Sequence, residues 1–462
     1  MKKYLLFAAV FCGCSAFGQE LVGYSLVFHP DRYVSRRLTV DGKVIRIRAY
    51  ENIVDVAHPV DTVYEKINVY VPEEYFEGGS VNGYTAATAP IFYPNMVGGY
   101  LPALPGTAIA VALAKGYVVA SAGARGRTTR DSSGIYTGKA PADIVDLKAG
   151  IRYLKYNDSR MPGDANKIVS NGTSAGGALS VLLGATGNNP DYESYLKAIG
   201  AADATDDIFA VSAYCPITDL DHADMAYEWQ FNGISDSGLS AAQIEVSGQL
   251  KRQFPTYLNS LHLKAKDGTL LVLDAEGNGS FKDFMKSFVV ASAQKALDAG
   301  KDLSKFSWLK INGGKVTDLD FDAFLRYMQR MRTPPAFDAL DLSAGGNQLF
   351  GNDRTDKQHF TDFSSQRSTV KASTADAVVV RMMNPMYYIG QAQTTTARHW
   401  RMRHGTKDNY TSLAIPVLLA IYLQNKGFDA NLELPWDRPH SGNYDLDELF
   451  KWIDGICKYR AL

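Results

Sequence analysis

A serine between two glycines is the first place in this sequence where the residue types indicate chemistry. The pentapeptide Gly172-Thr173-Ser174-Ala175-Gly176 follows a strand-like run at residues 167–170 and precedes a helical pattern at 177–183. A serine on such a strand-to-helix turn exposes its hydroxyl above a sheet, and the flanking glycines let the backbone approach closely. The pattern predicts that Ser174 is a nucleophile; the alternative is an ordinary glycine turn.

A serine nucleophile needs a base and an acid that orients the base. With a serine in this strand–turn–helix context, the chain order is serine, acid, histidine. Asp408 follows a predicted strand at residues 400–403, and His440 follows another at 431–434, 440 − 408 = 32 residues further on. Of the eight histidines, His440 alone meets both the order and the loop placement. We therefore expect Ser174, Asp408 and His440 to form a triad, although any single histidine could instead be structural.

Acyl transfer also requires donors for the oxyanion. One is expected from the backbone N–H of Ala175, directly after the nucleophile. The second is expected from the glycine-containing loop at 95–100, which follows a predicted strand at 91–93. Val97 and Gly98 are the candidate donors in that loop. The alternative is an ordinary glycine loop with no role in catalysis.

The elements that must position these residues follow a strand–helix alternation. Residues 45–48 and 66–71 alternate between apolar and polar positions, which indicates antiparallel strands. The later elements are predicted strands at 91–93, 117–121 and 167–170 and predicted helices at 108–114 and 143–156. The fold class is therefore predicted as α/β, with a mostly parallel, doubly wound sheet that begins with antiparallel strands.

This alternation stops after about residue 216 and returns near Trp400. The segment between has helical patterns, such as 240–258 and 284–297, and polar loops. A segment of roughly 175 residues is too long for a loop, so we expect a separately folded lid domain. The predicted organisation is a signal peptide at 1–18, a sheet domain formed by 19–215 and 391–462, and an inserted lid at 216–390.

The N-terminus has the pattern of a secretory signal. Two lysines precede an apolar run at 4–11, and small residues lead to an expected cleavage before Gln19. The alternative is a lipoprotein with the acyl chain on Cys14. Both indicate an exported protein, periplasmic or secreted. No other stretch reaches 18 apolar residues, so we predict no membrane span.

Composition excludes several classes of protein. With 48 basic and 49 acidic residues the formal charge is −1, and 11% of residues are aromatic. These values exclude a disordered chain and argue against nucleic acid binding. The small basic group Arg125, Arg127 and Arg130 is predicted to be a solvated loop. After signal removal Cys215 and Cys457 remain, as two buried thiols or, alternatively, a disulfide. No C-x-x-C motif exists, and neither a metal nor an organic cofactor is expected.

Three blocks of the sequence resemble the bacterial tannases (tannin acyl hydrolases). They are residues 171–180 around Ser174, residues 215–230 from Cys215 to Gln230, and Pro439-His440-Ser441-Gly442 with the following 444–447. The resemblance runs over most of the mature chain. It implies an α/β-hydrolase fold with a large lid and a serine–aspartate–histidine triad that hydrolyses galloyl esters. Carried over by motif, the triad is Ser174, Asp408 and His440.

The resemblance also shows departures. In that family a lid lysine, a lid glutamate and an aspartate near the catalytic acid bind the galloyl hydroxyls. The aspartate would lie two residues after Asp408, where this chain has Tyr410, and Arg332 stands in the lysine's neighbourhood. The glutamate would fall near Gly346 or Asn347, neither of which is acidic. Arg332 and Tyr410 are thus expected substrate-binding residues, with phenol recognition altered.

The predicted function is an exported serine esterase that hydrolyses small aromatic, galloyl-type esters through an acyl-enzyme. One alternative is a feruloyl esterase or another carboxylesterase on the same scaffold. A serine peptidase of the same fold, or a non-catalytic protein that kept the fold, are further alternatives, because a fold does not fix a function.

Overall fold

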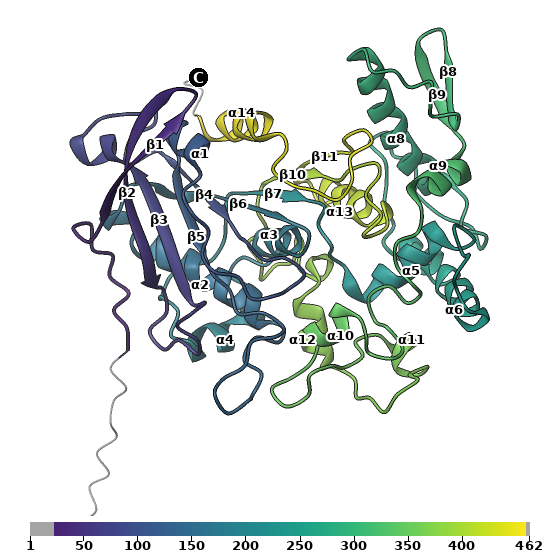
Figure 1. Cartoon of the computed structure of the whole chain (residues 1–462), viewed down its shortest axis with the longest axis horizontal. Coiled ribbons are helices and arrows are strands. Elements are labelled where there is room, and N and C mark those ends of the chain that lie inside the picture. The colour runs from purple at the N-terminus through teal and green to yellow at the C-terminus, as the bar shows by residue number, and fades with distance from the viewer. Residues whose placement is uncertain (1–22, 459–462) are drawn as a thin grey trace, which may run out of the picture.

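A nine-stranded sheet forms the centre of the molecule in the computed structural model, which describes residues 23–458 (Figure 1). Its strand order is β1-β2-β3-β5-β4-β6-β7-β10-β11. The strands are β1 (Val34–Val40), β2 (Lys43–Val54), β3 (Lys66–Pro72), β4 (Pro90–Pro94), β5 (Val118–Ala122), β6 (Asp164–Thr173), β7 (Ala210–Tyr214), β10 (His399–Arg403) and β11 (Asp429–Glu433).

The sheet changes from antiparallel to parallel along its width. β1, β2, β3 and β5 pair antiparallel, whereas β5, β4, β6, β7, β10 and β11 pair parallel. All residues of β4, β5 and β7 are buried, as expected for parallel strands covered on both faces. The predicted α/β class with an antiparallel start is thereby confirmed. The parallel order also brings the carboxyl ends of β4, β6, β10 and β11 to one edge, where ligands bind in such sheets.

Helices pack on both faces of this sheet. α1 and α14 lie on one face, and α2 and α3 lie on the other (Figure 1). The helices of the sheet region are α1 (Ala110–Ala114), α2 (Ala142–Tyr156), α3 (Ala175–Ala185), α4 (Glu193–Ala198), α13 (Ala414–Asn425) and α14 (Leu446–Cys457). The helix predicted at 143–156 matches α2 within one residue.

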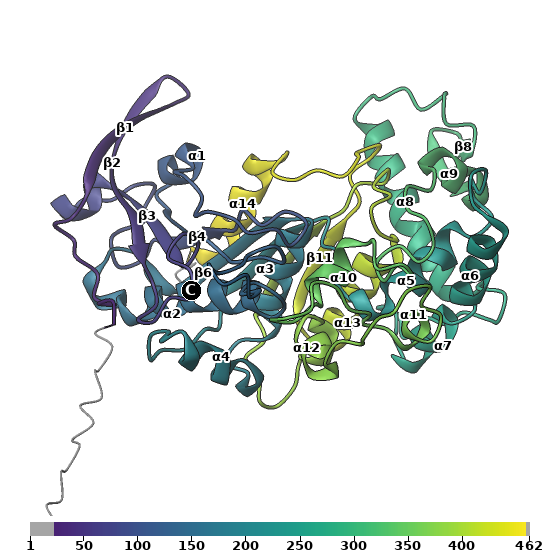
Figure 2. The ribbon, with the colours of Figure 1, turned by 60° about the horizontal axis from the view of Figure 1, so that its bottom comes forward.

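The chain between β7 and β10 contributes no strand to the central sheet. It contains a separate hairpin, β8 (Leu309–Asn312) and β9 (Lys315–Leu319), which the sequence analysis did not predict. Figure 2 shows most of its helices beyond the β11 end of the sheet, opposite β1. They are α5 (Leu220–Phe231), α6 (Ala241–Lys251), α7 (Phe254–Ser260), α8 (Ser280–Asp298), α9 (Phe321–Met328), α10 (Gly345–Leu349), α11 (Asp362–Ser365) and α12 (Ala377–Met382).

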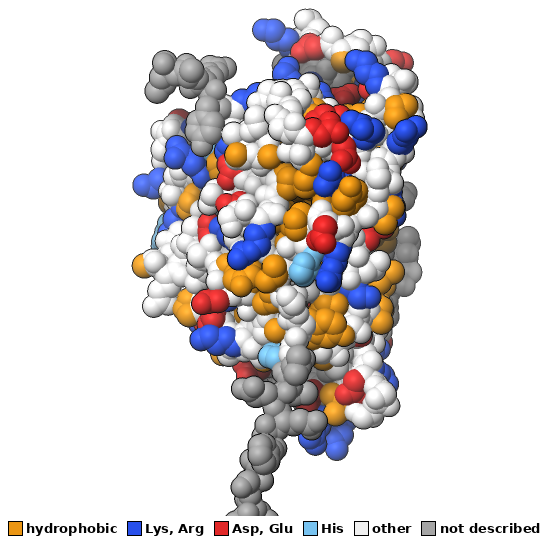
Figure 3. Space-filling view, turned by 90° about the vertical axis from the view of Figure 1, so that its left-hand side faces the viewer, with side chains coloured by type: hydrophobic (Ala, Val, Ile, Leu, Met, Phe, Trp, Pro, Cys, Tyr) orange, Lys and Arg blue, Asp and Glu red, His pale blue; other side chains and the backbone are white. Residues whose placement is uncertain are grey.

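Several predictions concern the ends and the surface of the chain. The expected signal at 1–18 and the alternative anchor at Cys14 lie outside the described residues, so export stays a prediction. No helix within 23–458 is long and apolar enough to cross a membrane. Cys215 and Cys457 are both buried, free thiols. At the end of the molecule that carries β1 and β2, basic, acidic and hydrophobic side chains are interspersed (Figure 3).

Candidate active site

Ser174 occupies a strained turn between β6 and α3. Its backbone has φ 62° and ψ −121°, which is uncommon for a residue other than glycine. The turn is held from both sides, because the Ser174 N–H donates to the Tyr214 carbonyl at 3.0 Å and the Ser174 carbonyl accepts from the Ala178 N–H at 2.9 Å. The side chain therefore lies above the carboxyl end of the sheet, where it lines a cavity.

Glycine is required on both sides of this serine. A Cβ on Gly172 would come within 2.2 Å of the Gly176 carbonyl oxygen. A Cβ on Gly176 would come within 2.5 Å of Asn95 Oδ1 and 2.7 Å of the Val97 carbonyl oxygen. Such distances exclude any side chain without backbone movement. The glycines therefore permit the start of α3 to pack against the loop that follows β4.

Asp408 and His440 meet after β10 and β11. His440 Nδ1 lies 2.7 Å from Asp408 Oδ2, and the Asp408 side chain is completely buried. Burial would raise the pKa of Asp408, but the neighbouring imidazoles of His404 and His440 outweigh it and hold this pKa at about 2. An ionised Asp408 accepts the Nδ1–H of His440, which fixes the tautomer of the imidazole.

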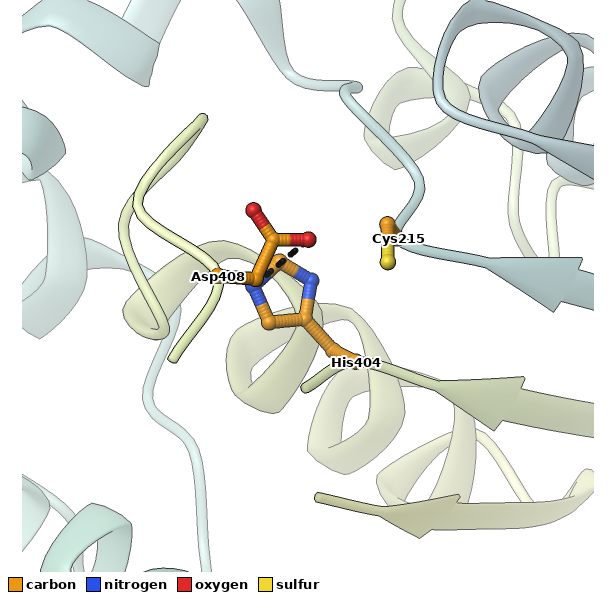
Figure 4. Close-up of side chains that lie close together, drawn as sticks. All are labelled: Cys215, His404 and Asp408. Atoms are coloured by element: carbon orange, nitrogen blue, oxygen red, sulfur yellow. Dashed lines mark ion pairs between the residues drawn. The ribbon is translucent and has the colours of Figure 1, made fainter. Parts of the chain in front are cut away.

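Behind Asp408 lies a buried cluster that the sequence analysis did not find. His404, directly after β10, and Cys215, directly after β7, converge on the carboxylate (Figure 4). Cys215 Sγ donates to the Ser441 carbonyl at 3.3 Å. His404 Nε2 lies 3.9 Å from Asp408 Oδ2, and neither ring nitrogen of His404 has a hydrogen-bond partner among residues 23–458.

The protonation states of Cys215 and His404 do not favour metal binding in this cluster. Burial lowers the pKa of His404 and raises the pKa of the Cys215 thiol, so both side chains are neutral near pH 7. The three ligand atoms lie within 4.8 Å of one another. A metal ion there would require a Cys215 thiolate, and it would compete with His440 for Asp408. A cation at this position would thus disrupt the pair at the cavity.

A second cluster of ligand-type side chains already contains a cation of its own. Asp219, Asp221 and His222 lie within 4.8 Å of one another at the start of α5. Burial opposes protonation, but Asp219 and Asp221 outweigh it and raise the pKa of His222 to about 10. The imidazolium therefore supplies the positive charge between these carboxylates.

The loop after β4 borders the serine. Asn95 is buried, and its Nδ2 donates to the Gly176 carbonyl at 2.9 Å and to Ser180 Oγ at 3.1 Å. Its Oδ1 accepts from the Val97 N–H at 3.3 Å. Asn95 thus ties this loop to helix α3. This role of Asn95 depends on packing between segments that are distant in the sequence, so the loop's own residues gave no sign of it.

One cavity of about 790 Å³ brings the predicted site residues together. Arg332 Nε donates to the Tyr410 carbonyl at 2.8 Å, so the chain between β7 and β10 reaches the edge of the sheet where Asp408 and His440 lie. Of the two positions compared with a family glutamate, Gly346 lines the cavity and Asn347 does not. The predicted residues that line it are Val97, Gly98, Ser174, Ala175, Arg332, Tyr410 and His440; Asp408 lies behind His440.

The prediction of a solvated loop at Arg125, Arg127 and Arg130 was wrong for two of the three. Arg125 is buried and its Nη2 lies 2.7 Å from Asp146 Oδ1. Arg127 is half-buried and lines the cavity. Only Arg130 is exposed. The buried Asp146 that pairs with Arg125 lies 21 residues away on α2, so local composition gave no sign of it.

The order of the strands and the positions of these residues define an α/β-hydrolase fold with a long insertion after β7. The family model described as BD-FAE matches residues 105–258, which include the turn at Ser174. A short match to Esterase LipC of Mycobacterium tuberculosis is 43% identical over 56 residues. That match covers 12% of this chain and 14% of LipC.

Several solved structures are similar to this chain over almost its whole length. Tannase from Lactobacillus plantarum is 49% identical, with a TM-score of 0.91, over 94% of this chain and 99% of that one. Tannase from Fusobacterium nucleatum is 48% identical, with a TM-score of 0.90, over 94% of this chain and 100% of that one. A tannin acyl hydrolase in complex with 3,4-dihydroxybenzoate is 51% identical, with a TM-score of 0.91, over 94% and 99%. The chain belongs to the bacterial tannase family, as the sequence resemblance indicated.

Proposed function

We propose that the chain is a serine esterase that hydrolyses esters of aromatic acids through an acyl-enzyme. The observation that carries the proposal is the position of Ser174 and the Asp408–His440 pair at one cavity. Ser174 sits on the strained turn after β6, and His440 lines the same cavity with Asp408 at its Nδ1. Those are the parts that acyl transfer requires.

In the first step Ser174 Oγ attacks the ester carbonyl carbon. His440 Nε2 takes the hydroxyl proton, and Asp408 stabilises the imidazolium that forms. The carbonyl oxygen becomes an oxyanion that needs backbone donors. Ala175 is the first residue of α3, a position whose N–H has no acceptor within the helix. Because Asn95 Oδ1 already accepts from the Val97 N–H, Gly98 is the better second donor.

In the second step the tetrahedral intermediate collapses. The C–O bond to the alcohol breaks, the alcohol oxygen takes the proton from His440, and the acyl group stays on Ser174 Oγ. Water then attacks the acyl carbon while His440 again accepts a proton. The aromatic acid leaves as the serine hydroxyl is restored.

The relatives support aromatic acids as the acyl part. Two of the similar solved structures are of tannin acyl hydrolase in complex with ethyl gallate, at 50% identity, and in complex with 3,4-dihydroxybenzoate, at 51% identity. Galloyl-type esters are therefore the first substrates to test. Comparison of methyl gallate with methyl ferulate distinguishes a tannase-type preference from a feruloyl esterase on the same scaffold.

The nucleophile is tested with Ser174→Ala. We expect kcat on methyl gallate to fall by at least about 10³-fold, because the covalent step is lost. The melting temperature should stay close to that of the wild type, because Ser174 is held through its backbone. Ser441→Ala, which changes another serine at the cavity, is the matched control and should retain activity. Near-normal turnover by Ser174→Ala would refute the proposal.

A further inference from the structure

The charges that line the catalytic cavity are all of one sign. Among the described residues around it are two arginines, Arg127 and Arg332, and the imidazole of His440, but no aspartate or glutamate. A guanidinium stays protonated in proteins. The cavity therefore presents two positive charges to a bound molecule with no acidic side chain on its wall.

Protein groups meet only part of the hydrogen-bonding capacity of the Arg332 guanidinium. Its Nε donates to the Tyr410 carbonyl at 2.8 Å, and its Cζ lies 4.9 Å from the centre of the Phe337 ring. No hydrogen bond from either terminal nitrogen, and no carboxylate within 4.0 Å, occurs in the described part of the chain. Burial lowers the pKa of Arg332, and the more distant carboxylates of Asp224 and Asp408 offset this only in part, so compensation of the charge inside the protein is incomplete.

The neighbouring arginine shows the contrast. Arg330 lies two residues before Arg332, and its Nη2 is 2.6 Å from Glu228 Oε2. Both partners in that pair are almost entirely buried. The same segment therefore carries one guanidinium neutralised inside the protein and one that faces the cavity without a carboxylate. Buried charges are normally paired. The two terminal nitrogens of Arg332, which have no partner among the described residues, therefore indicate that a group of the bound ligand pairs with them.

Arg127 extends the positive lining to the loop beside Ser174. Its Nε donates to the Gly99 carbonyl at 2.9 Å, and its Nη1 donates to Gln348 Oε1. The absence of a side chain at Gly345 leaves room next to this guanidinium, because a Cβ there would lie 3.6 Å from its Cζ. Arg127 thus has two neutral acceptors, whereas Arg332 has one and is the less satisfied of the two.

We propose that the ester hydrolysed here carries a second, ionised carboxylate on its aromatic acid, and that Arg332 binds this carboxylate. The inference rests on the esterase function proposed above and names its substrate class as half-esters of aromatic dicarboxylic acids. A planar guanidinium binds a carboxylate through two parallel N–H bonds. Arg332 is linked to Tyr410 and lines the same cavity as Ser174 and His440, so a molecule bound there can contact all three side chains.

The test compares charged esters with neutral esters of the same shape. Monomethyl isophthalate and monomethyl terephthalate are paired with the corresponding methyl carbamoylbenzoates, in which an amide replaces the carboxylate. We expect the wild type to prefer at least one acid over its amide by about tenfold or more in kcat/KM. In Arg332→Gln this ratio should fall towards one. The exposed Arg326→Gln is the matched control and should keep the wild-type ratio.

The outcomes separate the inference from the proposed function. Hydrolysis of methyl gallate with no preference for either acid over its amide would overturn the inference and leave the esterase standing. Loss of the preference in Arg127→Gln but not in Arg332→Gln would overturn the assignment to Arg332. Titration calorimetry of isophthalate and terephthalate against the Ser174→Ala protein provides a readout without turnover. There, Arg332→Gln should weaken binding about tenfold or more, and equal affinity would contradict the inference.

Discussion

The phenol ring of Tyr410 lies flat against the imidazole of His440, with ring centroids 4.1 Å apart and planes within 12° of parallel. The same tyrosine donates its backbone N–H to Asp408 Oδ1 at 3.0 Å, while His440 Nδ1 lies 2.7 Å from Oδ2. Asp408 therefore fixes the edge of the imidazole and the Tyr410 ring covers its face. Together these contacts restrict rotation of the ring that, in the proposed mechanism, carries the proton.

Removal of the ring should slow the reaction without abolishing it. In Tyr410→Ala the hydrogen bond to Asp408 remains, because it comes from the backbone, but the stacked face is lost. Aromatic stacking contributes about 0.5–1.5 kcal/mol, so we expect kcat on methyl gallate to fall roughly three- to tenfold. Tyr410→Phe keeps the ring and should retain the wild-type rate. An equal loss in both variants would show that the hydroxyl, rather than the stack, matters.

The carboxylate of Asp408 should be essential for rate but not for the fold. Asp408→Asn keeps the size of the side chain and removes the charge that holds Nδ1–H. We expect kcat/KM to fall by about 10³- to 10⁴-fold, as measured by steady-state hydrolysis of methyl gallate. The exposed Asp447→Asn, which makes the same chemical change away from the cavity, should have no effect. Wild-type turnover in Asp408→Asn would exclude this residue as the orienting acid.

Asn95 should act on the rate through the position of the oxyanion loop. Asn95→Ala removes the bonds from Nδ2 to the Gly176 carbonyl and to Ser180 Oγ. A displaced loop would weaken stabilisation of the oxyanion, so we expect kcat to fall about ten- to a hundredfold with a smaller change in KM. Ser180→Ala removes only one of the partners and should remain active. If KM rises in Asn95→Ala while kcat is unchanged, the loop binds substrate instead.

The sequence predicted the members of the proposed triad because local patterns mark their positions. The glycines around Ser174 and the strand–loop boundaries before Asp408 and His440 are visible in neighbouring residues. Neighbouring residues do not reveal that Arg332 lacks a carboxylate partner among the described residues, or that Arg127 contacts Gln348. Both features arise where the insertion meets the sheet. Likewise, His404 and Cys215 approach Asp408 only after β7 and β10 pair.

The differences in secondary structure have similar causes. β7 has the sequence Ala-Val-Ser-Ala-Tyr, with few residues that favour strands, and it is stabilised by β6 and β10 on either side. The helical pattern at 240–258 corresponds to two helices, α6 and α7, and Pro255 lies in the first turn of α7. A proline is tolerated there because its missing N–H needs no partner. The β8–β9 hairpin turns at Gly313 and Gly314, and a glycine pair between two short strands is a local signal for such a turn.

The cation at His222 should make the stability of the protein dependent on pH. His222 Nδ1 lies 2.8 Å from Asp219 Oδ1 and 3.5 Å from Asp221 Oδ1. Its ring stacks on Tyr257 at 3.7 Å, and the Tyr257 hydroxyl donates to Asp219 at 2.7 Å. Asp221 also accepts from the Tyr387 hydroxyl at 3.0 Å. Loss of the imidazolium would leave two carboxylates facing each other without a positive charge.

We expect His222→Gln to lower the free energy of unfolding by about 3 kcal/mol at pH 7, because it breaks a largely buried ion pair. The folded-state pKa of His222 is raised from its ordinary 6.5 to about 10. Its stabilising contribution is therefore fully present below pH 6.5 and is lost as the pH rises through about 10. Urea unfolding at pH 7 and pH 10.5 should show a large difference between wild type and variant at the lower pH and a small one at the higher. The control is His29→Gln, at a histidine whose side chain forms no ion pair in the described part of the chain. If the difference in the free energy of unfolding between wild type and His222→Gln stays constant with pH, the effect comes from packing and not from charge.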